Sequence, residues 1–207
     1  MDLTSIPVTL TIIFANVAIT IWTHYANPVY FRNLSEWPYQ IIHEKKYYQA
    51  LTSGFLHAGF AHLLFNMFAL FSFGSILEQL FVFNFGELNG RVFYLLIYFI
   101  SLFSGSLLTV LFHHKDPNYV AVGASGAISG IIFSYVIFFP FNQISVMFVP
   151  MPAFVFAFLY IAISVYGMKA RFGNIGHEAH LGGALGGFIA TLILIEGAWG
   201  ILLSHFQ

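Results

Sequence analysis

Long apolar runs alternate with short polar segments along this chain. A helix needs ~20 mainly apolar residues to cross the hydrocarbon core of a bilayer, and the runs approach that length. Trp22 and Tyr25 end the first run, where interfacial aromatic residues are common. The pattern predicts an all-α membrane protein, a six-transmembrane-helix bundle in which residues 1–207 form a single domain. The predicted spans run from about Pro7 to Trp22, Phe60 to Leu80, Arg91 to Phe112, Ser125 to Phe139, Pro152 to Tyr166 and His177 to Ile195.

Composition agrees with an integral membrane protein. Of the 207 residues, 59% are hydrophobic, 19% are aromatic and 7% are charged, whereas soluble domains carry ~25% charged residues. The net charge of −1 offers no attraction to a nucleic acid. The absence of cysteine excludes disulfides and thiolate nucleophiles. The segment Met1–Ser5 lacks the basic region of a signal peptide, so we expect the first apolar run to be retained as a span.

The longest connection between predicted spans runs from about Asn27 to Thr52 and is polar and aromatic. Connections of this length are uncommon in compact proteins and are often functional. Trp37 lies within a Trp-Pro-Tyr sequence that is typical of the membrane interface. We therefore expect the loop to lie against the lipid headgroups.

A run of small residues, Val122–Gly130, opens the fourth span and places Ser125 beside glycines. Glycine lets another chain approach the hydroxyl closely, and a helix N-terminus favours developing negative charge. Both features suit a serine nucleophile that forms an oxyanion. Small residues in a membrane helix also simply permit tight helix packing. Both interpretations are open from this stretch alone.

Few polar side chains lie within the predicted spans. An ionisable group at membrane depth costs at least ~2.5–3.5 kcal/mol, so each one is a candidate for function. Glu78, four residues after Gly74, is expected to tie the end of the second span to neighbouring backbone. The polar groups of interest are His62, Asn66 and Glu78 in the second span, and His177, Glu178 and His180 in the sixth.

Chain alternation brings three of the reactive groups to one side of the membrane. The second, fourth and sixth spans cross in the same direction, so their N-terminal ends share one face. His62, Ser125 and His180 each lie near the first turn of one of these spans. We therefore predict that the three side chains lie at one depth.

Glycine pairs spaced four residues apart predict that the fourth and sixth spans pack closely. If these ridges meet, Ser125 and His180 come within hydrogen-bond reach, the geometry that activates a serine. His62 and Asn66 share a helix face, and both can donate to an oxyanion alongside the Ser125 N–H. The pairs are Gly126/Gly130 on the fourth span, and Gly182/Gly186 and Gly183/Gly187 on the sixth.

Other intramembrane chemistries fit less well. Asp2 and Asp116 both lie outside the spans, which excludes an aspartyl pair, and no lysine lies within a span. His177 and His180 are three residues apart, whereas the zinc-binding HExxH pattern needs four. A metal site built from the histidine cluster stays open as an alternative, although we predict no metal or other cofactor. The cluster consists of His57, His62, His177 and His180.

Four motifs distributed over the chain together match the pattern of one protein family. They are His57-x4-His62-x3-Asn66, Gly74-x3-Glu78, Gly123-x-Ser125-Gly126 and Ala179-His180-x2-Gly183-x3-Gly187. With them, the chain from about Lys46 to Ile195 resembles the rhomboid family of intramembrane serine proteases. The resemblance implies Ser125 as nucleophile, His180 as general base, and His62 and Asn66 as oxyanion stabilisers. It also implies single-span membrane proteins as substrates, cut in or near the bilayer at sites with small residues and helix-destabilising sequence.

The sequence departs from the family pattern at two places. The first long loop of many members carries a Trp-Arg pair, and Tyr48 and Gln49 stand at the corresponding positions. Many members have an aromatic residue one turn after the serine that stacks on the histidine, and this chain has Ser129 there. The histidine must then be oriented by another group.

The distribution of cations conflicts with the orientation that the family implies. The family implies that the protein lies in a bacterial plasma membrane with its active site facing outward. It leaves Arg91 as the cation of the inward loops, against the positive-inside rule. We nevertheless expect the outward orientation, because a loop half-sunk in the interface can hold cations for lipid headgroups. The outward loops would contain Arg32, Lys45, Lys46, Lys115, Lys169 and Arg171.

Three functions are compatible with these residues. The leading one is an intramembrane serine endopeptidase with transmembrane proteins as partners. The second is a catalytically silent rhomboid-like protein that binds membrane clients, which the joint presence of Ser125 and His180 disfavours. The third is a metal-dependent membrane hydrolase or a transporter built on the histidine cluster.

Overall fold

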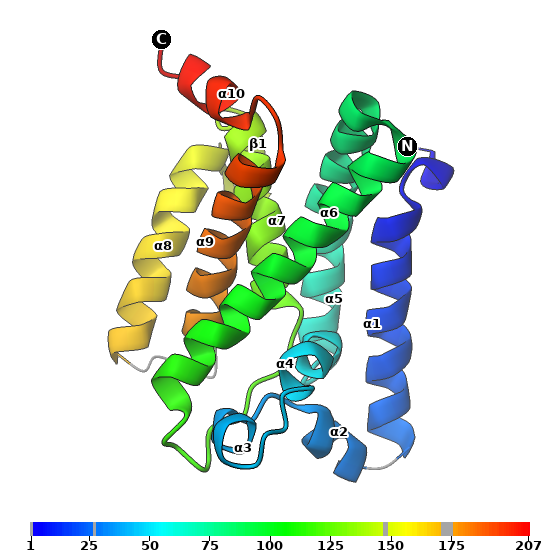
Figure 1. Cartoon of the computed structure of the whole chain (residues 1–207), viewed down its shortest axis with the longest axis vertical. Helices are drawn as coiled ribbons and strands as arrows, with labels where there is room; N and C mark the ends of the chain where they lie inside the picture. The colour runs from blue at the N-terminus through cyan, green and yellow to red at the C-terminus, as the bar shows by residue number, and fades with distance from the viewer. Residues whose placement is uncertain (1, 27, 147–148, 171–175) are drawn as a thin grey trace.

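The computed structural model describes residues 2–26, 28–146, 149–170 and 176–207, and the chain forms a bundle of helices (Figure 1). Asn27 and Arg171, both in predicted loops, lie outside the described residues. Short 3₁₀ turns span Leu3–Ser5 and Ser53–Phe55, and a π-helical turn spans Leu70–Gly74. The helices are α1 (Pro7–Ala26), α2 (Pro28–Leu34), α3 (Pro38–His43), α4 (Gln49–Thr52), α5 (Phe60–Ala69), α6 (Ser75–His113), α7 (Ser125–Phe138), α8 (Ala153–Ala170), α9 (His177–Leu194) and α10 (Ala198–Ser204).

The predicted all-α membrane bundle is confirmed, with one small addition. Strands β1 (Gln143–Val146) and β2 (Val149–Pro152) form an antiparallel hairpin between α7 and α8. Branched residues and prolines in this connection favour extended backbone over helix. The fifth predicted span therefore begins as a helix at Ala153, directly after the second strand.

The second and third predicted spans belong to one helical stretch, Phe60–His113, that reverses direction at Gly86. Gly86 has a φ of 79°, which glycine adopts without steric cost. A Cβ on Gly90 would lie 2.5 Å from the backbone carbon of Phe81, although nine residues of straight helix rise about 13 Å. The two arms therefore fold back on each other, and the connection between the predicted spans, from Leu80 to Arg91, is helical on both sides of Gly86.

Three helical stretches among the described residues are long and apolar enough to cross a membrane: Pro7–Tyr25, Phe60–His113 and Ala153–Ala170. A fourth is obtained if α9 and α10 form one span bent by 109°. Because Phe60–His113 contains 54 residues and reverses, it is long enough for two crossings. α7 has 14 residues, or about 21 Å of helix. The count of six spans remains a prediction.

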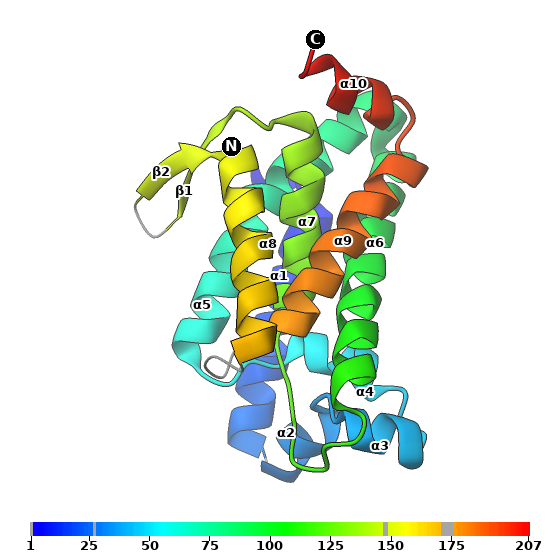
Figure 2. The ribbon, with the colours of Figure 1, turned by 90° about the vertical axis from the view of Figure 1, so that its left-hand side faces the viewer.

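α7 is the central helix of the bundle (Figure 2). Every residue from Gly126 to Ile137 is buried, which fits a helix that is apolar on all sides. Farther along it, the Thr191 hydroxyl of α9 donates to Ser134 at 2.8 Å. A site at the start of α7 is thus surrounded by the other helices.

The glycine ridges of α7 and α9 meet, as the sequence predicts. A Cβ on Gly183 would lie 2.0 Å from the carbonyl oxygen of Gly126, and one on Gly187 would lie 2.3 Å from the Cα of Gly130. The second ridge of α9 packs on α6, where a Cβ on Gly186 would meet the Ser104 side chain at 2.4 Å. Only hydrogen fits at these positions, so α9 is held close to both neighbours.

The shared face predicted for alternate spans is present. The starts of α5, α7 and α9 lie toward the end of the bundle that α2, α3 and α4 occupy, and α10 lies at the opposite end (Figure 1). Near that opposite end, Glu78 accepts hydrogen bonds from the N–H groups of Val8 (3.0 Å) and Thr9 (2.8 Å). This carboxylate satisfies donors in the first turn of α1, which confirms the role predicted for it.

Gln49 holds the long first loop together. It is fully buried, its amide nitrogen donates to the carbonyl oxygen of Asn33 (3.1 Å) and to the side chain of Gln40 (3.2 Å), and its amide oxygen accepts from the N–H of Trp37 (3.2 Å). An amide that both donates and accepts can link three parts of a loop. Gln49 thus anchors the loop at the position where many rhomboids carry an arginine.

Candidate active site

The Ser125 hydroxyl and the His180 imidazole form a direct contact. Ser125 is the first residue of α7 and His180 lies in the first turn of α9, and their Oγ and Nε2 atoms are 2.8 Å apart. The contact follows from the glycine packing of α7 on α9, since a wider separation of the two helices would carry the imidazole away. A base within hydrogen-bond reach of a hydroxyl is the arrangement that activates a serine.

The segment that leads into Ser125 is held by the first loop and by the 3₁₀ turn that follows the loop. Ala121 and Glu36 exchange two backbone hydrogen bonds of 2.9 Å, and the N–H of Gly123 donates to Ser53 at 3.0 Å. Gly123 has a φ of 132°, a conformation that side chains disfavour. The loop therefore sets the position of the residues immediately before the serine.

His62 lies beside the serine. A Cβ on Gly123 would lie 2.9 Å from the His62 Nε2 and 3.7 Å from the Ser125 Oγ. The backbone N–H of Ala58 donates to the His62 Nδ1 at 3.4 Å, and this assigns the ring proton to Nε2. The ring thus presents an N–H donor on the side of Gly123 and Ser125.

Asn66 lies one turn farther along α5. It is buried, and its amide nitrogen donates to the carbonyl oxygen of His62 at 2.9 Å. The structure therefore connects Asn66 to His62 rather than directly to Ser125. The amide carries a second hydrogen that this bond leaves available.

His57 and His177 flank the predicted site residues. His57 is fully buried, its Nδ1 lies 3.1 Å from the Thr20 hydroxyl, and its ring meets the His62 ring edge-on at 5.0 Å. Burial lowers the pKa of His57 to about 3, with a smaller effect from His62, so its imidazole is neutral. His177 packs against α8, where a Cβ on Gly167 would lie 2.3 Å from its Nε2.

The histidine cluster does not form a metal-binding group within the part of the chain that the structure describes. No group of three or more histidine and carboxylate side chains there is close enough to hold an ion. Glu178 instead pairs with His113 at 3.1 Å. The contacts described for His57 and His177 are with a hydroxyl, with another ring and with α8.

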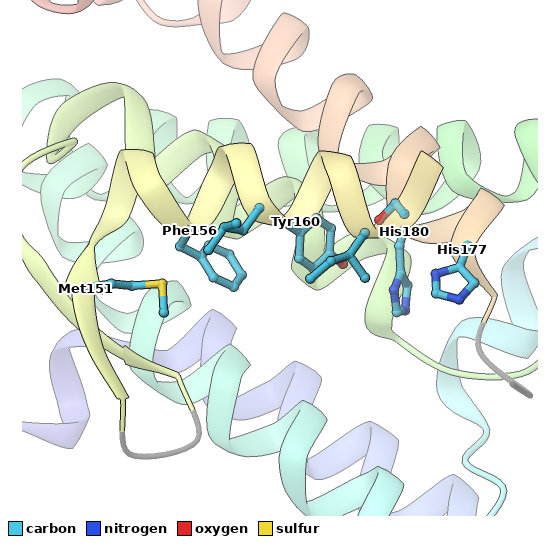
Figure 3. Close-up of a pocket in the computed structure, with 8 residues that line it drawn as sticks. Met151, Phe156, Tyr160, His177 and His180 are labelled. Carbon is cyan, nitrogen blue, oxygen red and sulfur yellow. The ribbon is translucent and has the colours of Figure 1, made fainter. Parts of the chain in front are cut away.

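Two residues at the site were not identified from the sequence. Tyr160 of α8 stacks on His180, with ring centroids 5.8 Å apart and an interplanar angle of 25° (Figure 3). Glu36 is buried, accepts a hydrogen bond from the Ser106 hydroxyl at 2.5 Å, and has its pKa raised by burial to about 8. Neither has a local sequence signal, because each contacts a residue distant in the chain.

A cavity of about 240 Å³ lies between α8 and α9 and reaches the His180 ring (Figure 3). Its lining is almost entirely apolar, apart from the two histidines, Ser164 and the Tyr160 hydroxyl. The residues that line it include Met151, Phe156, Tyr160, Ile163, His177 and His180.

The fold and this site define a class: a helical integral membrane protein with a serine–histidine pair at the start of two closely packed helices. Residues 44–197 match the Rhomboid domain. This match covers well over half of the chain, and the chain belongs to the rhomboid family, a family of intramembrane proteases.

Relatives from bacteria and a eukaryote share this region. YdcA, a rhomboid-family protein of Bacillus subtilis, is 32% identical over 157 residues, which are 73% of this chain and 69% of YdcA. Rhomboid protease GluP of the same organism is 29% identical over 154 residues, 74% of this chain and 27% of GluP. The mitochondrial Rhomboid protein 1 of Saccharomyces cerevisiae is 32% identical over 143 residues, 66% of this chain and 39% of that protein. The chain thus spans less than half the length of the last two.

Proposed function

We propose that this protein is an intramembrane serine endopeptidase in which Ser125 is the nucleophile and His180 the general base. The observation that carries the proposal is the 2.8 Å contact between the Ser125 Oγ and the His180 Nε2. Family membership supports the reaction class, since relatives such as GluP are named as rhomboid proteases. Among the described residues, the buried carboxylate of Glu178 pairs with His113 and none contacts the His180 ring, so the proposed pair is a dyad.

The first half of the reaction transfers the acyl group to the enzyme. His180 accepts the Ser125 proton while the Oγ attacks the carbonyl carbon of the scissile peptide. The tetrahedral intermediate then breaks its C–N bond, and His180 returns the proton to the leaving amine. An acyl-enzyme ester on Ser125 remains.

The second half restores the enzyme. His180 takes a proton from water as the water oxygen attacks the ester carbon, and collapse of the second intermediate returns that proton to the Ser125 Oγ. The products are a new amine terminus and a new carboxyl terminus.

Three donors are proposed to stabilise the oxyanion. The His62 Nε2–H lies on the side of Gly123 and Ser125, as the geometry around Gly123 supports. The backbone N–H of Ser125 begins α7, where the first N–H groups lack helical partners. Asn66 contributes its free amide hydrogen or, through its bond to the His62 carbonyl, the orientation of His62. Removing one oxyanion donor typically lowers kcat about 10²- to 10³-fold.

The proposed substrates are membrane proteins with a single span, cut in or near the bilayer. The apolar helices around the site support a substrate that approaches from the lipid rather than from water. The proposed location is a bacterial plasma membrane with the active site facing outward.

The test is reaction of the purified protein with a fluorophosphonate, a probe that forms a covalent bond with activated serines. We expect labelling at Ser125, mapped by mass spectrometry, and none in Ser125→Ala. His180→Ala should reduce labelling to that background, because an unactivated hydroxyl is a weak nucleophile. Labelling of wild type should increase with pH as His180 loses its proton.

Three results would count against the proposal. Labelling that persists in Ser125→Ala would place the nucleophile elsewhere. A folded wild-type protein that is neither labelled nor able to cut a single-span substrate would favour the silent client-binding function instead. Loss of cleavage on adding a chelator would favour metal-dependent hydrolysis.

A further inference from the structure

The orientation of the His180 imidazole depends on a helix that carries neither of the reactive groups. The Tyr160 ring of α8 stacks on the imidazole, with 5.8 Å between the ring centroids (Figure 3). The Nε2 atom of the imidazole lies 2.8 Å from the Ser125 Oγ. The third contact described for the ring is the edge of His177, at 6.4 Å. In serine proteases with a third catalytic residue, a carboxylate holds the imidazole in orientation. Among the described contacts, the ring that stacks on the imidazole and can hold its orientation is that of Tyr160.

Tyr160 is itself bound to the helix that carries the nucleophile. Its hydroxyl forms a hydrogen bond with the Ser129 Oγ, and that oxygen also donates to the carbonyl oxygen of Ser125 at 2.6 Å. Ser129 is buried one turn below Ser125. One side chain thus connects the backbone of the nucleophile, through a serine, to the face of the base.

Packing alone does not fix the Tyr160 ring. Phe133 and Phe156 touch it at centroid distances of 5.7 Å and 5.4 Å. However, the cavity of about 240 Å³ between α8 and α9 borders the same ring, so packed side chains do not enclose it completely. The hydroxyl bond to Ser129 therefore holds the end of the Tyr160 side chain against α7, beside the His180 ring.

α8 is loosely held compared with the central helix. Its buried residues are Ala153, Ser164 and Gly167, out of 18 residues, whereas twelve of the 14 residues of α7 are buried. The hydrogen bond between Tyr160 and Ser129 is therefore a polar contact that joins α8 to α7.

We propose that Tyr160 is the positioning residue for His180, and that the Ser125–His180 pair is fully assembled only while α8 is docked through the Ser129–Tyr160 hydrogen bond. The assignment rests on the proposed protease function. It gives Ser129 a role as the partner of Tyr160, and it makes the reactivity of the base sensitive to movement of α8.

The test measures the rate constant of fluorophosphonate labelling at Ser125 and the fraction of molecules finally labelled. Tyr160→Leu should lower the rate constant at least about tenfold, because a base displaced by a fraction of an ångström loses its alignment. Tyr160→Phe keeps the ring and should lose about two- to tenfold, the range expected for one hydrogen bond. The final labelled fraction should equal that of wild type, since slow molecules still react.

The hydrogen bond itself is tested by a double-mutant cycle. Ser129→Ala should slow labelling as much as Tyr160→Phe, and the double variant should be no slower than either single variant. Tyr166→Leu is the matched control, because Tyr166 lies on the same helix and is 69% exposed; it should label at the wild-type rate.

The outcomes separate this assignment from the proposed function. An unlabelled wild-type protein would overturn both. A labelled wild type with an unchanged rate in Tyr160→Leu would overturn this assignment alone, as would a slower rate accompanied by an equally reduced labelled fraction. If Tyr160→Leu does not fold, the cycle decides, and additive losses in Ser129→Ala and Tyr160→Phe would overturn the assignment.

Discussion

Gly123 is where the backbone allows His62 and Ser125 to approach each other. Its φ of 132° disfavours any side chain, and a Cβ there would lie 2.8 Å from the His62 ring. The glycine before the serine therefore provides both a backbone shape and the space for an oxyanion donor. Glycine is therefore required at position 123 for two separate reasons, its backbone conformation and the closeness of the His62 ring.

We predict that Gly123→Ala lowers the rate of Ser125 labelling by about tenfold or more while the protein remains folded, because loss of an aligned oxyanion donor costs that much or more. Labelling kinetics and a melting curve would measure the two effects. Gly59→Ala is the control, since Gly59 has an extended backbone and no atom within 4 Å of an added Cβ. Equal labelling in both variants would contradict the role given to Gly123.

Glu36 is a loop residue whose carboxyl group is buried in the folded protein. Its carboxyl lies against Ser106 of α6, and burial raises its pKa from 4.5 to about 8. In the unfolded chain it ionises near the ordinary value, so between these two pH values the folded protein holds one proton more. Stability therefore falls as pH rises through this window.

We predict that the melting temperature of wild type, measured relative to Glu36→Gln, decreases as pH rises from about 5 to about 8. Glutamine keeps a polar group beside Ser106 but does not ionise. Glu196→Gln, an exposed position, is the control and should show the same pH dependence as wild type. Parallel curves for wild type and Glu36→Gln would contradict a raised pKa.

At the scale of elements, the pairing of α7 with α9 determines whether the site exists. The contact between Gly183 and Gly126 brings the two backbones together directly after Ser125 and about one turn after His180. Small residues at such an interface are required in lipid, where helix association depends on close packing rather than on hydrophobic exclusion. The 2.8 Å contact of Ser125 with His180 is a consequence of this fit.

We predict that Gly183→Ala lowers both the melting temperature and the rate of Ser125 labelling. The added Cβ would lie 2.0 Å from the Gly126 carbonyl oxygen, which is backbone and cannot rotate away. Overpacking of this kind typically costs about 1–3 kcal/mol. Gly200→Ala in α10, where nothing lies within 4 Å of the new Cβ, should leave both measurements unchanged. A loss of equal size in Gly200→Ala would show that the effect is not specific to the ridge.

The same scale explains the two departures from the family pattern. Gln49 anchors the first loop through three hydrogen bonds, so an arginine is not needed there. The aromatic ring that many members carry one turn after the serine is here supplied by Tyr160, and Ser129 leaves the space that the Tyr160 hydroxyl occupies. Anchoring of the loop and stacking on the histidine are thus both provided by other residues that the fold brings to the same place.

At the scale of the whole molecule, the orientation in the membrane is where two arguments disagree. Two cations of the first loop have partners within it: Lys46 pairs with Glu44 at 2.9 Å, and the Arg32 guanidinium lies 4.9 Å from the centre of the Trp37 ring. Cations with such partners contribute to contacts within the loop. They are therefore weaker evidence that the loop is cytoplasmic than free basic residues would be.

We predict that the face with the starts of α5, α7 and α9 is external. The chain has no cysteine, so single cysteines can be introduced without background. Asn118→Cys, in the loop before Ser125, should react with a membrane-impermeant maleimide in intact cells. Asn89→Cys, near the Gly86 reversal, should react only after lysis. The cysteine-free wild type is the control, and the opposite pattern would invert the orientation but leave the catalytic proposal intact.

The sequence by itself determined the membrane class, the approximate helices and the candidate catalytic residues. Apolar runs of bilayer length allow little but helices, because backbone polar groups in lipid must bond within their own segment. Polar groups are so costly there that His62, Asn66, Ser125 and His180 stand out individually. The glycine pairs on α7 and α9 predicted their contact, since close approach is a local property of each helix.

Only the tertiary structure decided what orients these groups. Tyr160 is 20 residues before His180, on another helix, and looks like any other aromatic residue in an apolar span. Glu36 resembles an ordinary loop acid until the fold buries it against Ser106. Likewise, Gly86 signals a break but not that Phe60–His113 stays helical on both sides of a reversal. Such roles arise from contacts between distant segments, and the packing of helices, rather than the local pattern, determines which segments meet.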